Sequence, residues 1–178
     1  MVNQLSVGID LKVKDYLSLL GGSEYANPWV AGCVNAYVVA LSSIPFKFYR
    51  DKGSAKRLED NHPLVRLFWD INPHTTRNQF WQQSVQMLLL TGECFWALER
   101  LNGRGQPQEM WVLPPDKVEI VPHKTEFITG YRYRVNANEV FYQTDELIFT
   151  KRPDPNSFYR GLSPLAAARQ AVLFYYFS

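Results

Sequence analysis

The chain has 178 residues, 46% hydrophobic and 20% charged, which suits one domain of ordinary size and excludes an intrinsically disordered protein. It carries 19 Lys and Arg against 17 Asp and Glu, so its net charge of +2 is far below that of a protein that binds DNA tightly by neutralising phosphates. The first residues lack the pattern of a signal peptide, and no apolar run approaches the roughly 18 residues that cross a bilayer, so we expect a soluble, intracellular protein without membrane contact.

The first predicted helix covers residues 26–42. Residues 1–24 show no sustained hydrophobic period and are expected to form a flexible N-terminal arm, and one domain is expected over residues 25–178. Pro28 lies in the first turn of the helix, where its missing N–H costs nothing, and Pro45 predicts an end near Ser42. The expected apolar stripe follows the i, i+3/i+4 spacing: Ala26, Val30, Val34, Tyr37, Val38 and Leu41. Residues 46–50 then partly alternate and predict a strand that runs into a polar turn at residues 51–54.

Two more helices are predicted before the main strands begin. The first runs from His62-Pro63 to about Trp69. The second begins at about Arg77, because Thr76 and Gln79 fit a capping box there. It runs to Leu90 and stops at Thr91-Gly92. Apolar residues nearly encircle this second helix, which indicates a central core element: Phe80, Trp81, Val85, Met87, Leu88, Leu89 and Leu90.

Strands dominate the predicted structure from residue 94 onward. Residues 94–100 and 109–113 are expected to form a hairpin, with a Gly-containing turn between its two strands. Further short strands are expected to follow it: residues 118–121, 130–135, 139–143 and 146–150. The clearest period of two lies in residues 130–135, with Tyr131 and Tyr133 on one face and Arg132 and Arg134 on the other.

A last helix is predicted to begin at Ser163-Pro164 and to be still running at Phe177, so the chain looks cut within an element. Helices, then an antiparallel meander, then the start of a further helix indicate an α+β fold with helices packed on one side of a sheet.

The sequence carries no motif of an enzyme, a cofactor site or a metal centre, so we expect no catalysis, no cofactor and no metal. The three histidines have no second ligand at metal-binding spacing: His62, His74 and His123. Glu93 and Glu99 would share one face of a regular strand, but unpaired glutamates are far commoner than acid–base pairs, so a hydrolase is a remote reading.

Sulfur and aromatic residues point to packing rather than chemistry. Cys33 and Cys94 each lie in an apolar stretch and form no C-x-x-C pair, so we expect two buried free thiols. Aromatic residues make up 15% of the chain, a surplus that fills a core or a subunit interface.

One surface pattern keeps a binding function open. Basic residues alternate with aromatic ones, as on surfaces that bind nucleic acids: Arg132, Arg134, Lys151, Arg152 and Arg160 beside Tyr131, Tyr133, Phe158 and Tyr159. We take Arg132, Arg134, Lys151 and Arg152 as the candidate nucleic-acid contacts. An ordinary solvated strand face is the competing interpretation, since Glu126 and Asp154 dilute the positive charge.

Six short segments stand in a specific order between residues 30 and 170. They are residues 33–49, which end in Ile-Pro-Phe-Lys-Phe-Tyr; 62–68, His-Pro-Leu-Val-Arg-Leu-Phe; 89–96, Leu-Leu-Thr-Gly-Glu-Cys-Phe-Trp; 113–118, Leu-Pro-Pro-Asp-Lys-Val; 146–149, Glu-Leu-Ile-Phe; and 161–168, Gly-Leu-Ser-Pro-Leu-Ala-Ala-Ala. Together they resemble the portal (head–tail connector) proteins of tailed bacteriophages. The pattern departs from the family at Glu93, where the family usually has Asn, and at Phe149, where it usually has His.

The resemblance implies a structural subunit rather than an enzyme. Portal subunits form a dodecameric ring at one capsid vertex, through which double-stranded DNA is packaged and ejected. The terminase large subunit, capsid proteins, head–tail adaptors and the tail are the implied partners, in the virion and, during assembly, in the bacterial cytoplasm. The matched segments correspond to the N-terminal wing region, so the chain is expected to stop before the stem, clip and crown. A small nucleic-acid-binding domain remains the alternative function.

Overall fold

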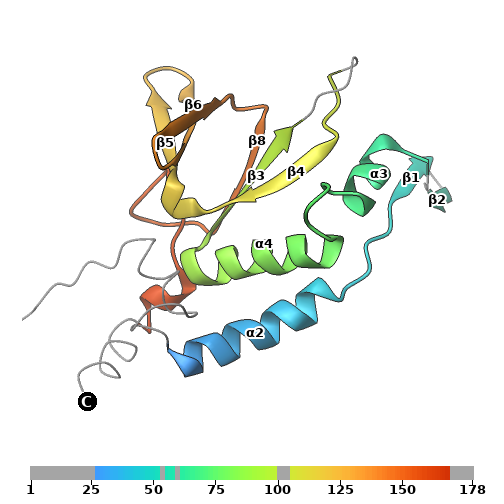
Figure 1. Ribbon diagram of the computed structural model, residues 1–178, viewed down its shortest axis with the longest axis horizontal. Helices are drawn as coiled ribbons and strands as arrows, with labels where there is room; N and C mark the ends of the chain where they lie inside the picture. The colour runs from blue at the N-terminus through green and yellow to red at the C-terminus, as the bar shows by residue number, and fades with distance from the viewer. Residues whose placement is uncertain (1–26, 53–54, 59–60, 100–104, 169–178) are drawn as a thin grey trace, which may run out of the picture.

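The computed structural model describes residues 27–52, 55–58, 61–99 and 105–168 (Figure 1). Within these ranges, three helices precede the two larger antiparallel sheets, and a two-stranded hairpin lies between the first and second helices, which confirms the α+β prediction. The predicted N-terminal arm lies outside the described residues. Among the described residues, no helix has the length and apolar character that crossing a membrane requires.

The first described helix, α2, spans Pro28–Ser42, so it ends where predicted and begins two residues later than predicted, and Ala26 lies outside the described residues. The Asn27 side chain accepts hydrogen bonds from the N–H groups of Trp29 and Val30, at 3.0 and 3.1 Å, and so caps the helix start. Only Val30, Val34 and Val38 are buried. The apolar stripe is therefore narrower than predicted, because Tyr37 and Leu41 are 62% and 43% exposed.

The next two helices also begin and end where local signals predicted. Helix α3 spans Pro63–Trp69 and is capped by His62. Helix α4 spans Arg77–Thr91 and begins with the predicted capping box of Thr76 and Gln79. It ends at Gly92, whose φ of 75° is the left-handed conformation that glycine adopts without strain.

The strand predicted over residues 46–50 is wrong in position. Strand β1 spans Tyr49–Lys52 and pairs with β2, Ala55–Leu58, a strand that the sequence did not indicate. Phe46 stacks on Trp81 with 4.4 Å between ring centroids, and Phe48 packs on Phe68 at 5.3 Å. The aromatic side chains before β1 thus pack against helices instead of alternating across a strand.

The remaining strands form two separate three-stranded antiparallel sheets instead of one meander. The first has the order β4-β3-β8, and the second, β5-β6-β7, is a true meander. Their bounds are Glu93–Glu99 for β3, Glu109–Leu113 for β4, Leu147–Lys151 for β8, Val118–His123 for β5, Phe127–Val135 for β6 and Asn138–Tyr142 for β7. The short 3₁₀ helix η1, Pro115–Lys117, separates β4 from β5, so the chain changes sheet where two prolines interrupt it.

Helix α4 lies at the centre, between α2 and the sheets (Figure 1). One core cluster joins α2 to the end of α4 through Val34, Val38 and Leu90. A second joins α3, α4 and β4 around Phe80, and a third fills the space between the two sheets around Phe95. Cys94 is buried as predicted, but the prediction for Cys33 is wrong, because that thiol lies on the exposed side of α2.

The chain after β8 returns to the end of α4. The predicted last helix begins with a 3₁₀ turn, η2 (Pro164–Ala166), capped by the Ser163 hydroxyl, and residues 169–178 lie outside the described residues. The Ser163 hydroxyl also donates to the carbonyl of Leu90, at 2.5 Å. A Cβ atom on Gly92 would collide with the backbone carbonyl of Leu162, so the two backbones meet where only glycine fits.

We expect Gly92→Ala to lower the free energy of unfolding by at least about 2 kcal/mol, measured by chemical denaturation. The left-handed conformation costs an alanine about 1–2 kcal/mol, and the collision with Leu162 adds to this cost. Gly105→Ala is the matched control, because Gly105 has a similar φ of 70° but open space around it. Equal losses in the two variants would contradict a close contact between Gly92 and Leu162.

Candidate functional site

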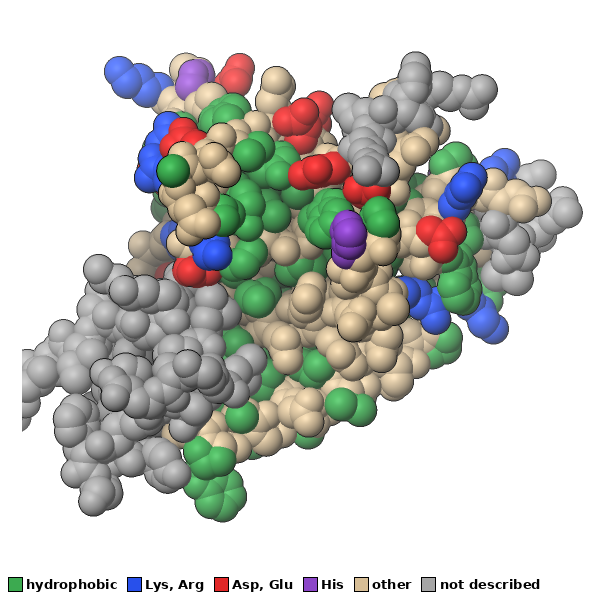
Figure 2. Space-filling model, viewed as in Figure 1, with side chains coloured by type: hydrophobic (Ala, Val, Ile, Leu, Met, Phe, Trp, Pro, Cys, Tyr) green, Lys and Arg blue, Asp and Glu red, His purple; other side chains and the backbone are tan. Residues whose placement is uncertain are grey.

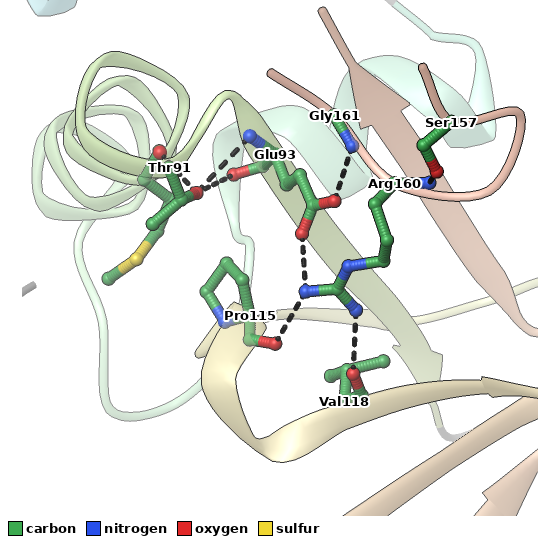
Figure 3. A network of polar contacts seen from close by, with 8 residues as sticks. Thr91, Glu93, Pro115, Val118, Ser157, Arg160 and Gly161 are labelled. Carbon is green, nitrogen blue, oxygen red and sulfur yellow. Dashed lines mark hydrogen bonds and ion pairs between the residues drawn. The ribbon is translucent and has the colours of Figure 1, made fainter. Parts of the chain in front are cut away.

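Polar side chains and backbone groups meet in a buried junction around Glu93, at the start of β3 (Figure 3). The Glu93 side chain is only 1% exposed. Its Oε1 accepts a hydrogen bond from the N–H of Gly161 at 2.5 Å, and its Oε2 lies 2.7 Å from Nη2 of Arg160. This second contact has the distance of an ion pair without the alignment of a hydrogen bond.

Arg160 connects the junction to the second sheet. Its Nη1 donates to the carbonyl of Val118 at 3.0 Å, and its Nη2 donates to that of Pro115 at 3.3 Å (Figure 3). One guanidinium therefore holds the carboxylate at the start of β3 and two carbonyls at the entrance to β5. This use of several donors in a fixed fork is specific to arginine.

Burial dominates the electrostatics of this carboxyl. Removal from water raises the pKa of Glu93 above its ordinary value of 4.5. Three groups lower this pKa, but by less than burial raises it: the Arg160 charge, the Gly161 N–H and the Lys151 charge. The charged form of Glu93 is thus tolerated in the fold at a cost.

Backbone hydrogen bonds close the same junction. The N–H of Arg152 donates to the carbonyl of Gly92 at 2.8 Å, and the N–H of Leu162 donates to that of Arg152 at 3.3 Å. Residues 152–163 therefore form a loop that closes against the connection between α4 and β3. Three of the six segments quoted from the sequence meet here: residues 89–96, 113–118 and 161–168.

From the sequence, Arg160 was predicted only to be part of a basic surface, and its contact with Glu93 was not predicted. A signal was present, because Glu93 stands between Gly92 and the apolar run Cys94-Phe95-Trp96. A carboxylate placed among core residues needs a cation or several N–H donors. Which cation supplies this partner depends on tertiary structure, and local sequence patterns do not reveal it.

The basic face of β6 has the predicted alternation but is neutralised within its own sheet. Arg132 and Arg134 each contact Glu119 on β5 and Glu139 on β7, at 2.8 to 3.3 Å. On the opposite face, Tyr131 is buried between the sheets. Tyr133 packs against the same cluster, so these two tyrosines do not share a surface with the arginines.

The other two candidate nucleic-acid contacts lie at the end of β8, in the other sheet. The Lys151 ammonium donates to the backbone carbonyl of Phe158, and Arg152 follows it with an exposed side chain. The four candidate cations thus come from two sheets, and DNA contact through them stays a prediction.

The remaining polar candidates take structural roles. Glu93 and Glu99 lie at opposite ends of β3, about 20 Å apart by the strand rise, which is too far for a joint acid–base step. The Tyr142 hydroxyl donates to Glu99 at 2.7 Å, and burial followed by this bond raises the pKa of Tyr142. The described residues hold no group of three His, Cys, Asp or Glu that could bind a metal ion.

Comparison with known proteins identifies the family. The family model described as "Phage portal protein" matches residues 28–175. The chain belongs to the phage portal protein family. An uncharacterised protein of Rickettsia bellii (strain RML369-C) is 26% identical over 148 residues, which cover 80% of this chain and 37% of that protein.

Several solved structures share this fold. A neck structure of an empty gene transfer agent (GTA) particle with C6 symmetry matches 90% of this chain and 43% of its own, with a TM-score of 0.76 and 24% identity. The neck of a native GTA particle with C12 symmetry matches 89% and 41%, with a TM-score of 0.73 and 22% identity. An HK97-family phage portal protein from Corynebacterium diphtheriae matches 82% and 42%, with a TM-score of 0.50 and 19% identity. The portal-family chain described here spans about two fifths of the length of these relatives.

The raised pKa of Glu93 predicts a pH dependence with a definite sign. Above pH 4.5 the Glu93 carboxyl ionises more readily in the unfolded state than in the folded state. The free energy of unfolding therefore decreases with pH until the carboxyl is ionised in the folded state too. The free energy of unfolding of the wild type, minus that of Glu93→Gln, should therefore fall as the pH rises from 4.5 towards 7. Chemical denaturation at several pH values measures this difference.

Glu126→Gln, which removes an exposed carboxylate, controls for the loss of one negative charge. A difference that rises with pH would contradict the account, since it would mean that Arg160 lowers the Glu93 pKa by more than burial raises it.

Proposed function

We propose that this chain is the wing region of a structural subunit in a phage-type portal ring. In this role it belongs to a ring at the capsid vertex of the virion, and that ring is the channel through which double-stranded DNA is packaged and ejected. The observation that carries the proposal is the family match over residues 28–175, almost all of the described chain. A structural rather than a catalytic role is part of the same proposal.

The junction around Glu93 supports this assignment. The quoted portal-like segments are scattered over the sequence, yet three of them meet at the contacts of Glu93, Arg160 and Ser163. Segments that hold one buried network together are constrained as a group, which accounts for a family pattern without catalytic residues. The dodecameric state and the terminase, capsid, adaptor and tail partners are carried by the family resemblance alone.

The charge distribution fits a conduit better than a DNA clamp. A protein that grips duplex DNA offers free cations to the phosphates, and its affinity falls steeply with salt. Here the net charge is +2, and Arg132 and Arg134 are paired with Glu119 and Glu139. Such a surface contributes little to holding DNA in place.

The assembly state of the full product of the parent reading frame tests the proposal. Native mass spectrometry and negative-stain imaging should show a large ring with an axial hole, because subunits of a portal join head to tail and close. A product that stays monomeric at micromolar concentration would contradict the proposal. DNA binding by that monomer, lost between about 50 and 200 mM salt, would favour the small nucleic-acid-binding domain instead.

A further inference from the structure

Helix α2 is the least expected part of the surface. None of its fifteen residues, Pro28–Ser42, is charged, yet ten of the fifteen are exposed. Trp29 is 75% exposed, Tyr37 62% and Val39 55%. A helix that is apolar all round is normally buried, whereas a solvated helix carries charged or polar residues on its outer side.

The apolar surface continues beyond the helix. Ile44, Phe46 and Tyr49, on the connection to β1 and at its start, are 52%, 40% and 55% exposed. A cylinder about 22 Å long and 10 Å wide approximates α2. With about two thirds of its side area exposed, as for ten of its fifteen residues, α2 alone exposes roughly 450 Å². One partner in a stable interface contributes about 800 Å², so the helix and its continuation approach the size of a complete interface.

Gly32 adds an observation that the single chain does not explain. It lies in the middle of α2, and a Cβ atom there would meet nothing within 4 Å. Glycine at an exposed helix position costs about 1 kcal/mol relative to alanine. Neither its conformation nor its packing within the described chain requires glycine, whereas close approach of another backbone does.

We propose that the outward face of α2, which we define as Trp29, Gly32, Cys33, Ala36, Tyr37 and Ala40, is the surface on which a neighbouring copy of this chain packs. This inference rests on the proposed ring, because cyclic rings of more than two subunits use head-to-tail contacts, in which each subunit leaves one surface for each neighbour. The lack of charge suits a permanent subunit contact, which is more apolar than a transient one.

Figure 2 places the helix at the edge of the molecule, with exposed hydrophobic side chains along that side of the view. It is separated from the sheets by α4 (Figure 1). A neighbour can therefore reach the α2 face without displacing the β-sheets or the Glu93 junction.

Substitution in the full product of the reading frame tests the surface. Trp29→Glu places a charge in an apolar contact, so it should abolish the ring. The subunit should keep its secondary structure, measured by circular dichroism, because Trp29 is mostly exposed. Phe158→Glu is the matched control, since Phe158 is 82% exposed and lies in the loop after β8. This variant should form rings at the wild-type yield. Native mass and negative-stain imaging measure both.

The two cysteines give a second readout that distinguishes the possible occupants of the face. Cys33 lies on the α2 face, and Cys94 is buried, which raises the pKa of its thiol to about 11. Maleimide should label Cys33 more than about tenfold faster in Trp29→Glu monomers than in wild-type rings, because labelling requires access to the thiol. Cys94 should stay unlabelled in both.

Each other outcome overturns a specific statement. Normal rings from Trp29→Glu, or rapid Cys33 labelling in rings, would exclude the α2 face as the subunit contact and leave the proposed ring intact. Equal protection of Cys33 in monomers and rings would mean that another segment of the same chain covers the face. Ring loss in Phe158→Glu as well would show a general effect of added charge. A wild type that forms no ring would refute the proposed function itself.

Discussion

The buried carboxylate of Glu93 is the constraint on which the arrangement of layers depends. A side chain that is 1% exposed and ionisable needs donors around it, and these come from Arg160 and from Gly161, 68 residues further along the chain. Gly161 can approach only because it lacks a Cβ, which would collide with the backbone of Gly92 and the side chain of Glu93. The last described loop is thereby fixed to the connection between α4 and β3. Since Arg160 also holds the entrance to β5, the helices and both sheets become one unit.

The arginines of β6 are paired within their own sheet, whereas helix α2 carries no charge and exposes apolar side chains. Arg132 and Arg134 are balanced by Glu119 and Glu139 across three neighbouring strands, and exposed pairs of this kind add little stability. The uncharged helix α2 lies on the far side of α4 from the sheets. A subunit that is neutral over one sheet and apolar along an outer helix is suited to contacts with other protein chains.

Local sequence signals predicted the helices well, because their ends depend on neighbouring residues. Pro28, the Thr76–Gln79 capping box and Gly92 each act within one turn, and all three end up where predicted. Features that depend on distant residues were missed. Phe46 lies outside the strand predicted for it, because it stacks on Trp81. The pairing of β8 with β3 joins segments about fifty residues apart. The Arg160–Glu93 contact is of the same kind, and the exposure of Cys33 depends on how the described residues pack on only one side of α2.

Hydrogen exchange of backbone amides tests most directly whether the junction unites the layers. The informative amides are those of Arg152, Gly161 and Leu162, which bond to Gly92, Glu93 and Arg152. If the junction holds the layers as one unit, these amides should exchange only on global unfolding, at rates matching the amides of β3 in the sheet core. Exchange at the rate of an exposed loop, while β3 stays protected, would show that residues 152–163 open independently and would contradict the account.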